Sequence, residues 1–150
     1  MSSLPPSPTS VPTVEPPKPA TVLVIDDDPM VLQALVILLE DHGFGVLVAT
    51  DGVQGHDLYR QHRPDIVVTD IIMPEKEGVE LTRELRREFP EAKIVAMSGG
   101  GRMGTSDYVA IAKGLGADAG LYKPFDDDEF IATLRSLLRP ASPSAQNSAA

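Results

Sequence analysis

Short apolar runs recur five times along the chain, and stretches with helical periodicity separate them. Several of the runs are rich in β-branched residues, as in Thr21–Ile25 and Ile66–Thr69, which is typical of buried strands. Strict alternation of strands and helices predicts a parallel sheet with helices on both faces. Because crossovers between parallel strands are right-handed, the carboxyl ends of all the strands then meet at one edge of the sheet. The chain is therefore predicted to form an α/β domain.

Turn and capping residues set the expected limits of the elements. Asp28 before Pro29 begins a helix, because the carboxylate caps free backbone amides and proline fits the first helical position. Gly43 ends that helix. The strands are expected at residues 21–25, 44–49, 66–69, 93–97 and 119–122, and the helices at 29–42, 53–62, 78–89, 106–115 and 126–139.

The folded part is expected to be a single domain at residues 21–139, flanked by two tails. Residues 1–20 hold half of the 14 prolines, mixed with Ser and Thr, and cannot bury enough apolar surface to offset their ordering entropy. We expect this segment to be disordered, with a proline-rich ligand for a partner as the alternative. Residues 140–150 are rich in Ser and Ala and are expected to be a second disordered tail.

Composition excludes several classes of function. A net charge of −9 argues against binding to nucleic acid or to an anionic membrane, both of which favour a basic surface. The absence of Cys excludes disulfides and thiolate metal sites. The chain shows neither a secretory signal pattern at its start nor an apolar run of the roughly 18 residues that a spanning helix needs. We therefore expect a cytoplasmic protein without nucleic-acid or membrane partners.

Polar residues stand where four of the expected strands end. Asp26 and Asp27 follow the first strand, Asp70 the third, Ser98 the fourth and Lys123 the fifth. Open α/β sheets bind their ligands at this edge, so these side chains are predicted to lie together. Each has a plainer explanation when taken alone, as a helix cap or a solvated loop residue. Capping explains neither Asp26 nor Asp27, because Asp28 already fills that role. The set, at the ends of four strands, is far more specific than any member.

The chemistry of this set indicates phosphoryl transfer. Three carboxylates repel one another, and an oxygen-only group without His or Cys suits a hard cation, most simply Mg²⁺. Phosphoryl transfer needs a nucleophile, neutralisation of charge and positioning. Asp70 is the candidate nucleophile, the metal and Lys123 neutralise oxygen charge, and the Ser98 hydroxyl donates to a phosphoryl oxygen.

Four stretches, 22–29, 64–74, 96–99 and 116–125, carry a resemblance to a known family. They read Val-Leu-Val-Ile-Asp-Asp-Asp-Pro, Pro-Asp-Ile-Val-Val-Thr-Asp-Ile-Ile-Met-Pro, Ala-Met-Ser-Gly and Gly-Ala-Asp-Ala-Gly-Leu-Tyr-Lys-Pro-Phe. In order and spacing the chain resembles the CheY-like receiver domain of two-component response regulators over residues 21–139. The resemblance implies a flavodoxin-like (βα)5 fold, a three-layer sandwich with strand order 2-1-3-4-5.

The resemblance also implies roles for individual residues. Asp70 would become a 4-aspartylphosphate by taking a phosphoryl group from a sensor histidine kinase or a histidine phosphotransfer protein. Asp27 and Asp70 would bind Mg²⁺ directly, together with the Ile72 backbone carbonyl, and Asp26 would act mainly through water. Ser98 stands at the switch hydroxyl position and Lys123 at that of the phosphate-binding lysine. The protein would be a signalling protein that promotes its own phosphorylation and dephosphorylation rather than an enzyme.

The chain departs from the family pattern at Gly120. An aromatic residue that swings inward on activation usually stands three positions before the lysine. Tyr122 lies two residues on and faces the same side of a strand as Gly120. Either Tyr122 partly substitutes in the switch, or the switch works without an aromatic residue. The phosphorylation chemistry does not depend on this difference.

Several alternatives stay open from the sequence. The receiver is expected to stand alone, as a diffusible regulator that signals through protein contacts or as a phosphorelay intermediate, and as a monomer or a phosphorylation-dependent dimer. An unphosphorylated scaffold and a flavin-binding redox protein are the other classes, although three acidic residues after the first strand would repel a flavin phosphate. The glycines of Gly99–Gly104 match a dinucleotide-binding pattern only weakly and favour a loop that rearranges beside Ser98. The excess of apolar residues in the first helix indicates either a protein-binding face or a deeply covered helix.

Overall fold

A computed structural model of the chain describes residues 19–70, 77–99 and 113–138. Its elements are β1 (Thr21–Ile25), α1 (Pro29–Asp41), β2 (Gly45–Ala49), α2 (Gly52–His62), β3 (Ile66–Asp70), α3 (Glu77–Glu88), β4 (Ile94–Gly99), β5 (Ala119–Lys123) and α5 (Asp127–Leu138). The two expected tails, most of the expected helix at 106–115, the glycine-rich loop beyond Gly99 and the Ile72 carbonyl lie outside the described residues.

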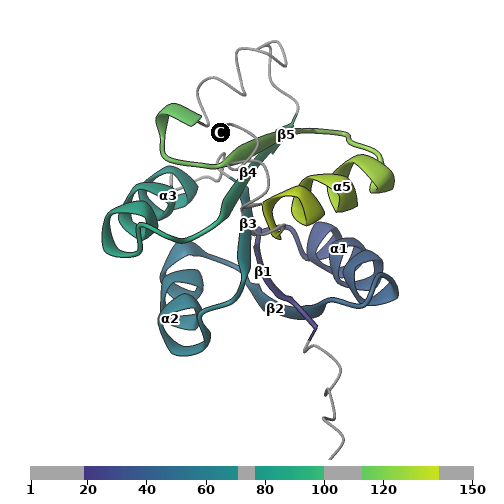
Figure 1. Cartoon of the computed structure of the whole chain (residues 1–150), viewed down its shortest axis with the longest axis horizontal. Coiled ribbons are helices and arrows are strands. Elements are labelled where there is room, and N and C mark those ends of the chain that lie inside the picture. Colours follow the sequence, from purple (N-terminus) through teal and green to yellow (C-terminus); the bar gives the residue numbers. More distant parts are fainter. Residues whose placement is uncertain (1–18, 71–76, 100–112, 139–150) are drawn as a thin grey trace, which may run out of the picture.

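The five strands form one parallel sheet in the order β2-β1-β3-β4-β5. Helices α1 and α5 lie on one side of the sheet, and α2 and α3 lie on the other (Figure 1). The predicted flavodoxin-like architecture and strand order are confirmed. Within the described residues, no helix has the length and apolar character that a membrane span requires.

Alternating strand residues build a separate core on each face of the sheet. In β1, Leu23 and Ile25 face the α2–α3 side, whereas Val22 and Val24 face the α1–α5 side. All four side chains are fully buried, as are Ile66, Val67 and Val68 of β3. Burial on both faces is the reason that these strands read as continuous apolar runs in the sequence.

Capping residues fix where the helices begin, as predicted for α1. The Asp28 carboxylate accepts a hydrogen bond from the Met30 amide at 2.9 Å, with Pro29 in the first turn. Asp51 caps α2 in the same way, by accepting from the Gln54 amide at 2.8 Å. These caps place the start of each helix directly after the carboxyl end of the preceding strand.

The strands extend further at their carboxyl ends than the sequence indicates. Asp70 and Lys123 are the last residues of β3 and β5, and Ser98 lies inside β4, although all three were expected just after their strands. The reason is the parallel register, in which Asp70 aligns with Met97 and Lys123 with Gly99. Other limits shift by a residue or two, as at Phe44, which precedes β2 because its amide bonds to the Leu39 carbonyl at the end of α1.

We expect Gly55→Ala to destabilise the protein. A Cβ atom at Gly55 would lie 2.5 Å from Cδ1 of Ile25, a fully buried core residue, so either the Ile25 side chain or α2 has to shift. Overpacking of this kind costs about 1–3 kcal/mol, and the better helix propensity of alanine offsets up to about 1 kcal/mol. Urea unfolding followed by circular dichroism is expected to show a loss of about 1–2 kcal/mol.

Gly114→Ala is the matched control, because a Cβ atom there would meet nothing within 4 Å. Its free energy of unfolding is expected to stay the same or to rise slightly. Equal stability of the two variants would contradict the close packing of α2 on β1.

Candidate functional site

Polar side chains that are buried gather at the carboxyl edge of the sheet. Asp26, Asp70 and Ser98 are 1%, 8% and 2% exposed, and they stand at the ends of β1, β3 and β4. Buried carboxylates are costly unless they are paired or bound to a cation. The buried carboxylates of Asp26 and Asp70 at the centre of this edge therefore indicate a binding or catalytic site.

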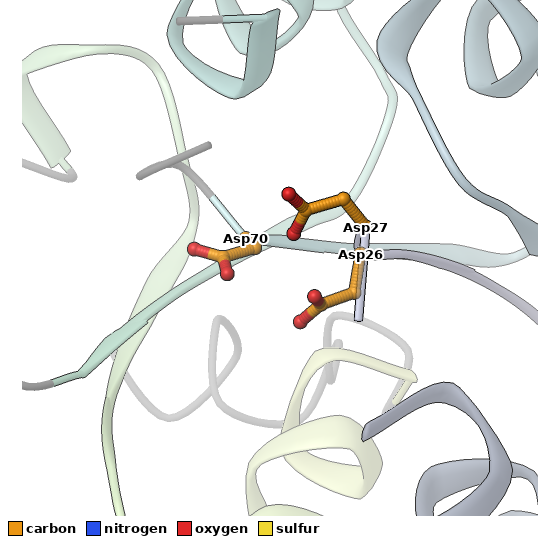
Figure 2. Close-up of side chains that lie close together, drawn as sticks. All are labelled: Asp26, Asp27 and Asp70. Carbon is orange, nitrogen blue, oxygen red and sulfur yellow. The ribbon is translucent and has the colours of Figure 1, made fainter. Parts of the chain in front are cut away.

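Asp26, Asp27 and Asp70 form a compact acidic cluster. Each offers a carboxylate oxygen, and these three oxygens lie within 4.8 Å of one another. Figure 2 shows the side chains projecting from the ends of the neighbouring strands β1 and β3. Asp27 is exposed, whereas Asp26 and Asp70 are buried, so the cluster opens to solvent on the Asp27 side.

Lys123 brings a positive charge to the cluster from the far edge strand. Its Nζ donates to Asp26 Oδ2 at 3.1 Å and to Asp70 Oδ2 at 3.3 Å. Burial by itself lowers the pKa of this ammonium, but the charges of Asp70 and Asp26 and their hydrogen bonds together raise the pKa above its ordinary value. Lys123 is therefore charged at neutral pH and ties β5 to β1 and β3.

The charge balance of the cluster fits a divalent cation. Three carboxylates and one ammonium leave two negative charges in a small volume. The ligand atoms are oxygens only, which are the ligands that Mg²⁺ prefers in proteins. The residues present therefore fit Mg²⁺, with Asp27 on the side that is open to solvent.

Asp26 is engaged on both of its oxygens. Oδ1 accepts from the Asp28 amide at 2.9 Å, and Oδ2 accepts from Lys123. The direct contact with Lys123 was not predicted, since the two residues stand 97 positions apart and no local pattern connects them. These bonds hold Asp26 in place, and its action on the metal mainly through water stays a prediction.

Ser98 and Tyr122 are direct neighbours across β4 and β5. They align in the register, as Ala96 does with Gly120. Within the described ranges, no hydrogen bond is recorded for the buried Ser98 hydroxyl. Tyr122 packs on the α2–α3 core, whereas Leu121 belongs to the opposite core. Tyr122 therefore lies beside the proposed switch hydroxyl, and its part in switching stays a prediction.

Comparisons with known proteins agree with this geometry. The family model described as "Response regulator receiver domain" matches residues 22–135. The response regulator MprA of Mycobacterium sp. (strain KMS) is 40% identical over 125 residues, which cover 83% of this chain and 53% of MprA. MprA of Mycobacterium avium (strain 104) is 38% identical over 122 residues, which cover 81% of this chain and 52% of that protein.

Solved structures show the same architecture. A receiver domain protein from Clostridium thermocellum superposes with a TM-score of 0.71 at 29% identity, over 79% of this chain and 93% of that one. A chain of the CheX–CheY complex with BeF3 and Mg²⁺ from Borrelia burgdorferi superposes with a TM-score of 0.72 at 25% identity, over 81% and 90%. The chain spans about half the length of the MprA relatives. Since the family match covers nearly all of the described fold, the chain belongs to the response regulator receiver domain family.

Proposed function

We propose that this receiver accepts a phosphoryl group on Asp70 from a phosphohistidine in a Mg²⁺-dependent reaction and signals through contacts with other proteins. The observation that carries the proposal is the convergence of Asp26, Asp27 and Asp70 with the Lys123 ammonium at one edge of the sheet. A carboxylate nucleophile, an acidic metal cluster and a fixed positive charge are the parts that such a transfer requires.

In the proposed reaction, Asp70 is the nucleophile. One carboxylate oxygen attacks the phosphorus of the phosphohistidine, the new O–P bond forms, and the P–N bond breaks. The imidazole nitrogen keeps the bonding electron pair and takes a proton from water. Mg²⁺, when bound by Asp27 and Asp70, supplies positive charge that balances the phosphoryl oxygens.

Lys123 and Ser98 are proposed to contact the oxygens of the phosphoryl group on Asp70. The Lys123 ammonium already hydrogen-bonds Asp70, so it lies within reach of oxygens that develop negative charge there. The Ser98 hydroxyl is buried near the end of β4, which pairs with β3, and we expect it to donate to another of these oxygens. Both residues would therefore stabilise the negative charge of the phosphoryl oxygens, which is present only after phosphorylation.

Removal of the metal tests this proposal. Acetyl phosphate with Mg²⁺ is expected to add the mass of one phosphoryl group to the intact protein, and an excess of EDTA is expected to prevent the addition. The physical reason is that the attacking carboxylate and the phosphoryl oxygens repel each other without the cation. A phosphoryl adduct that forms equally well in EDTA would contradict the role of the metal.

The phosphodonor is proposed to be a sensor histidine kinase or a histidine phosphotransfer protein, and the recipient of the signal a second protein. The expectations of a stand-alone receiver, a cytoplasmic location and no nucleic-acid partner stay predictions, since the chain matches only about half of the MprA sequences. An unphosphorylated scaffold is the alternative function. It would be favoured if both acetyl phosphate and a phosphohistidine donor failed to modify Asp70.

A further inference from the structure

A cavity of about 200 Å³ lies between α2 and α3, separate from the acidic cluster of the site. Its lining includes Asp57, Glu80 and Glu84, the imidazole of His56, and the aliphatic residues Val53 and Leu81. We call this cavity the acidic groove. Gly52 and Val53, which stand at the start of α2, also border it, so the groove reaches the part of α2 that follows the carboxyl edge of the sheet.

The groove combines an apolar anchor with an acidic rim. Leu81 lines the groove but is only 2% exposed, whereas Val53 is 68% exposed, so Val53 is the aliphatic side chain that a partner can reach. A single exposed aliphatic residue is common on protein surfaces, so it is the position of Val53 beside an acidic cavity that makes it a candidate contact. The apolar part is therefore available to a side chain from another molecule.

The carboxylates around the groove determine the charge that a partner needs at this surface. Asp57, Glu80, Glu84 and Glu88 lie on its two helices, and Arg60 is the cation that contacts them, at 3.5 Å from Asp57 and 3.8 Å from Glu88. His56 contacts Glu84 at 3.4 Å and Glu88 at 3.0 Å through its two ring nitrogens.

Among the described residues, the lining of the groove holds the carboxylates of Asp57, Glu80 and Glu84 and no Lys or Arg side chain. Within the described part of the chain, Glu80 takes part in no recorded ion pair and is exposed at the rim. The rim therefore attracts a cation.

We propose that the acidic groove docks a segment of a partner protein in which an aliphatic side chain stands next to an arginine or a lysine. The aliphatic group enters the cavity against Val53 and Leu81, and the cation meets Glu80 and Glu84. The volume is smaller than the roughly 300–1,000 Å³ of pockets that hold drug-sized ligands, so a single protein side chain suits it better. The proposal does not depend on phosphorylation of Asp70.

The test uses a small probe with this chemistry on the full chain. N-acetyl-leucyl-arginine amide is titrated against the ¹⁵N-labelled protein, and amide shifts are followed by NMR. Saturable shifts are expected at Val53, His56 and Leu81. The same peptide with citrulline in place of arginine keeps the shape without the charge and is expected to bind about fivefold more weakly.

Two matched pairs of variants locate the binding. Glu80→Arg is expected to weaken the arginine probe at least about fivefold, whereas Glu40→Arg makes the same change on an exposed residue of α1 and is expected to have no effect. Val53→Ser is expected to weaken the probe, whereas Val48→Ser, at another exposed valine, is not.

The proposal would be overturned if Glu80→Arg weakened the probe no more than Glu40→Arg, or if Val53→Ser weakened it no more than Val48→Ser. Amide shifts spread over the whole surface of the protein would also overturn it. It would also be overturned by concentration-dependent self-association through α2 and α3, which would make a second copy of the chain the occupant.

Discussion

Asp70→Asn is expected to abolish phosphorylation by acetyl phosphate and by any phosphohistidine donor. The amide oxygen lacks the negative charge and the free electron density of a carboxylate nucleophile, and no acyl phosphate can form on it. The backbone of β3 is unaffected, because asparagine is nearly isosteric with aspartate. Intact mass spectrometry after incubation with acetyl phosphate and Mg²⁺ is expected to show no adduct in the variant.

Asp65→Asn provides the control at the opposite end of β3. Asp65 immediately precedes β3 at the opposite end, where its carboxylate accepts from the Thr21 amide at 2.8 Å, away from the acidic cluster. This variant is expected to be phosphorylated like the wild type. An adduct in Asp70→Asn that maps to Asp26 or Asp27 would show that the nucleophile was assigned to the wrong carboxylate.

Lys123→Gln is expected to have the second largest effect, on both activity and stability. It removes a positive charge that acts on the phosphoryl oxygens, which is worth on the order of 10²-fold in rate. It also leaves the carboxylates of Asp26 and Asp70, which are buried, without the cation that now hydrogen-bonds both. We expect a loss of about 2 kcal/mol in the metal-free protein, less than for a fully buried pair because the Lys123 side chain is 24% exposed.

The pH dependence of this stability difference follows from the raised pKa of Lys123. A group whose pKa is raised by folding contributes its full stability below its ordinary pKa, which is 10.5 here. The contribution is lost only as the pH rises through the higher pKa of the folded state. The difference in free energy of unfolding between wild type and Lys123→Gln, measured with urea, is therefore expected to stay constant from about pH 7 to about pH 9. It is expected to shrink once the pH exceeds the ordinary lysine pKa of 10.5.

Lys113→Gln makes the same change of charge on an exposed residue and serves as the control. It is expected to leave the free energy of unfolding within about 0.5 kcal/mol of wild type. A stability difference for Lys123→Gln that fell away already between about pH 7 and about pH 9 would contradict the assignment to this ammonium.

Local patterns in the sequence determine the elements and their order. Residues 22–25 of β1 and 66–68 of β3 are buried on both faces, and this double burial favours apolar side chains at successive positions. Asp28 fixes the start of α1 by accepting a hydrogen bond from the Met30 amide two positions on, with Pro29 in the first turn. Such interactions span a few positions, so a single sequence contains all that is needed to predict them.

The candidate site is predictable to the extent that topology alone brings residues together. Parallel strands with right-handed crossovers send Asp26, Asp70 and Lys123 to one edge whatever their distance in sequence. Their roles follow from chemistry, and the family resemblance adds the direction of phosphoryl transfer. The sequence therefore indicates which residues meet, and their roles in the reaction stay predictions until phosphorylation is measured.

Only the tertiary structure decides how these residues are paired and what lies beside them. The bond from Lys123 to Asp26, the opening of the cluster at Asp27 and the cavity between α2 and α3 depend on the register and the packing of distant segments. A shift of one residue in register turns each side chain of a strand to the other face, and nothing local in the sequence reports such a shift. The sequence by itself determined the sheet, its functional edge and the residues that stand there, whereas packing between distant segments decided their contacts, because those contacts exist only after the chain has folded.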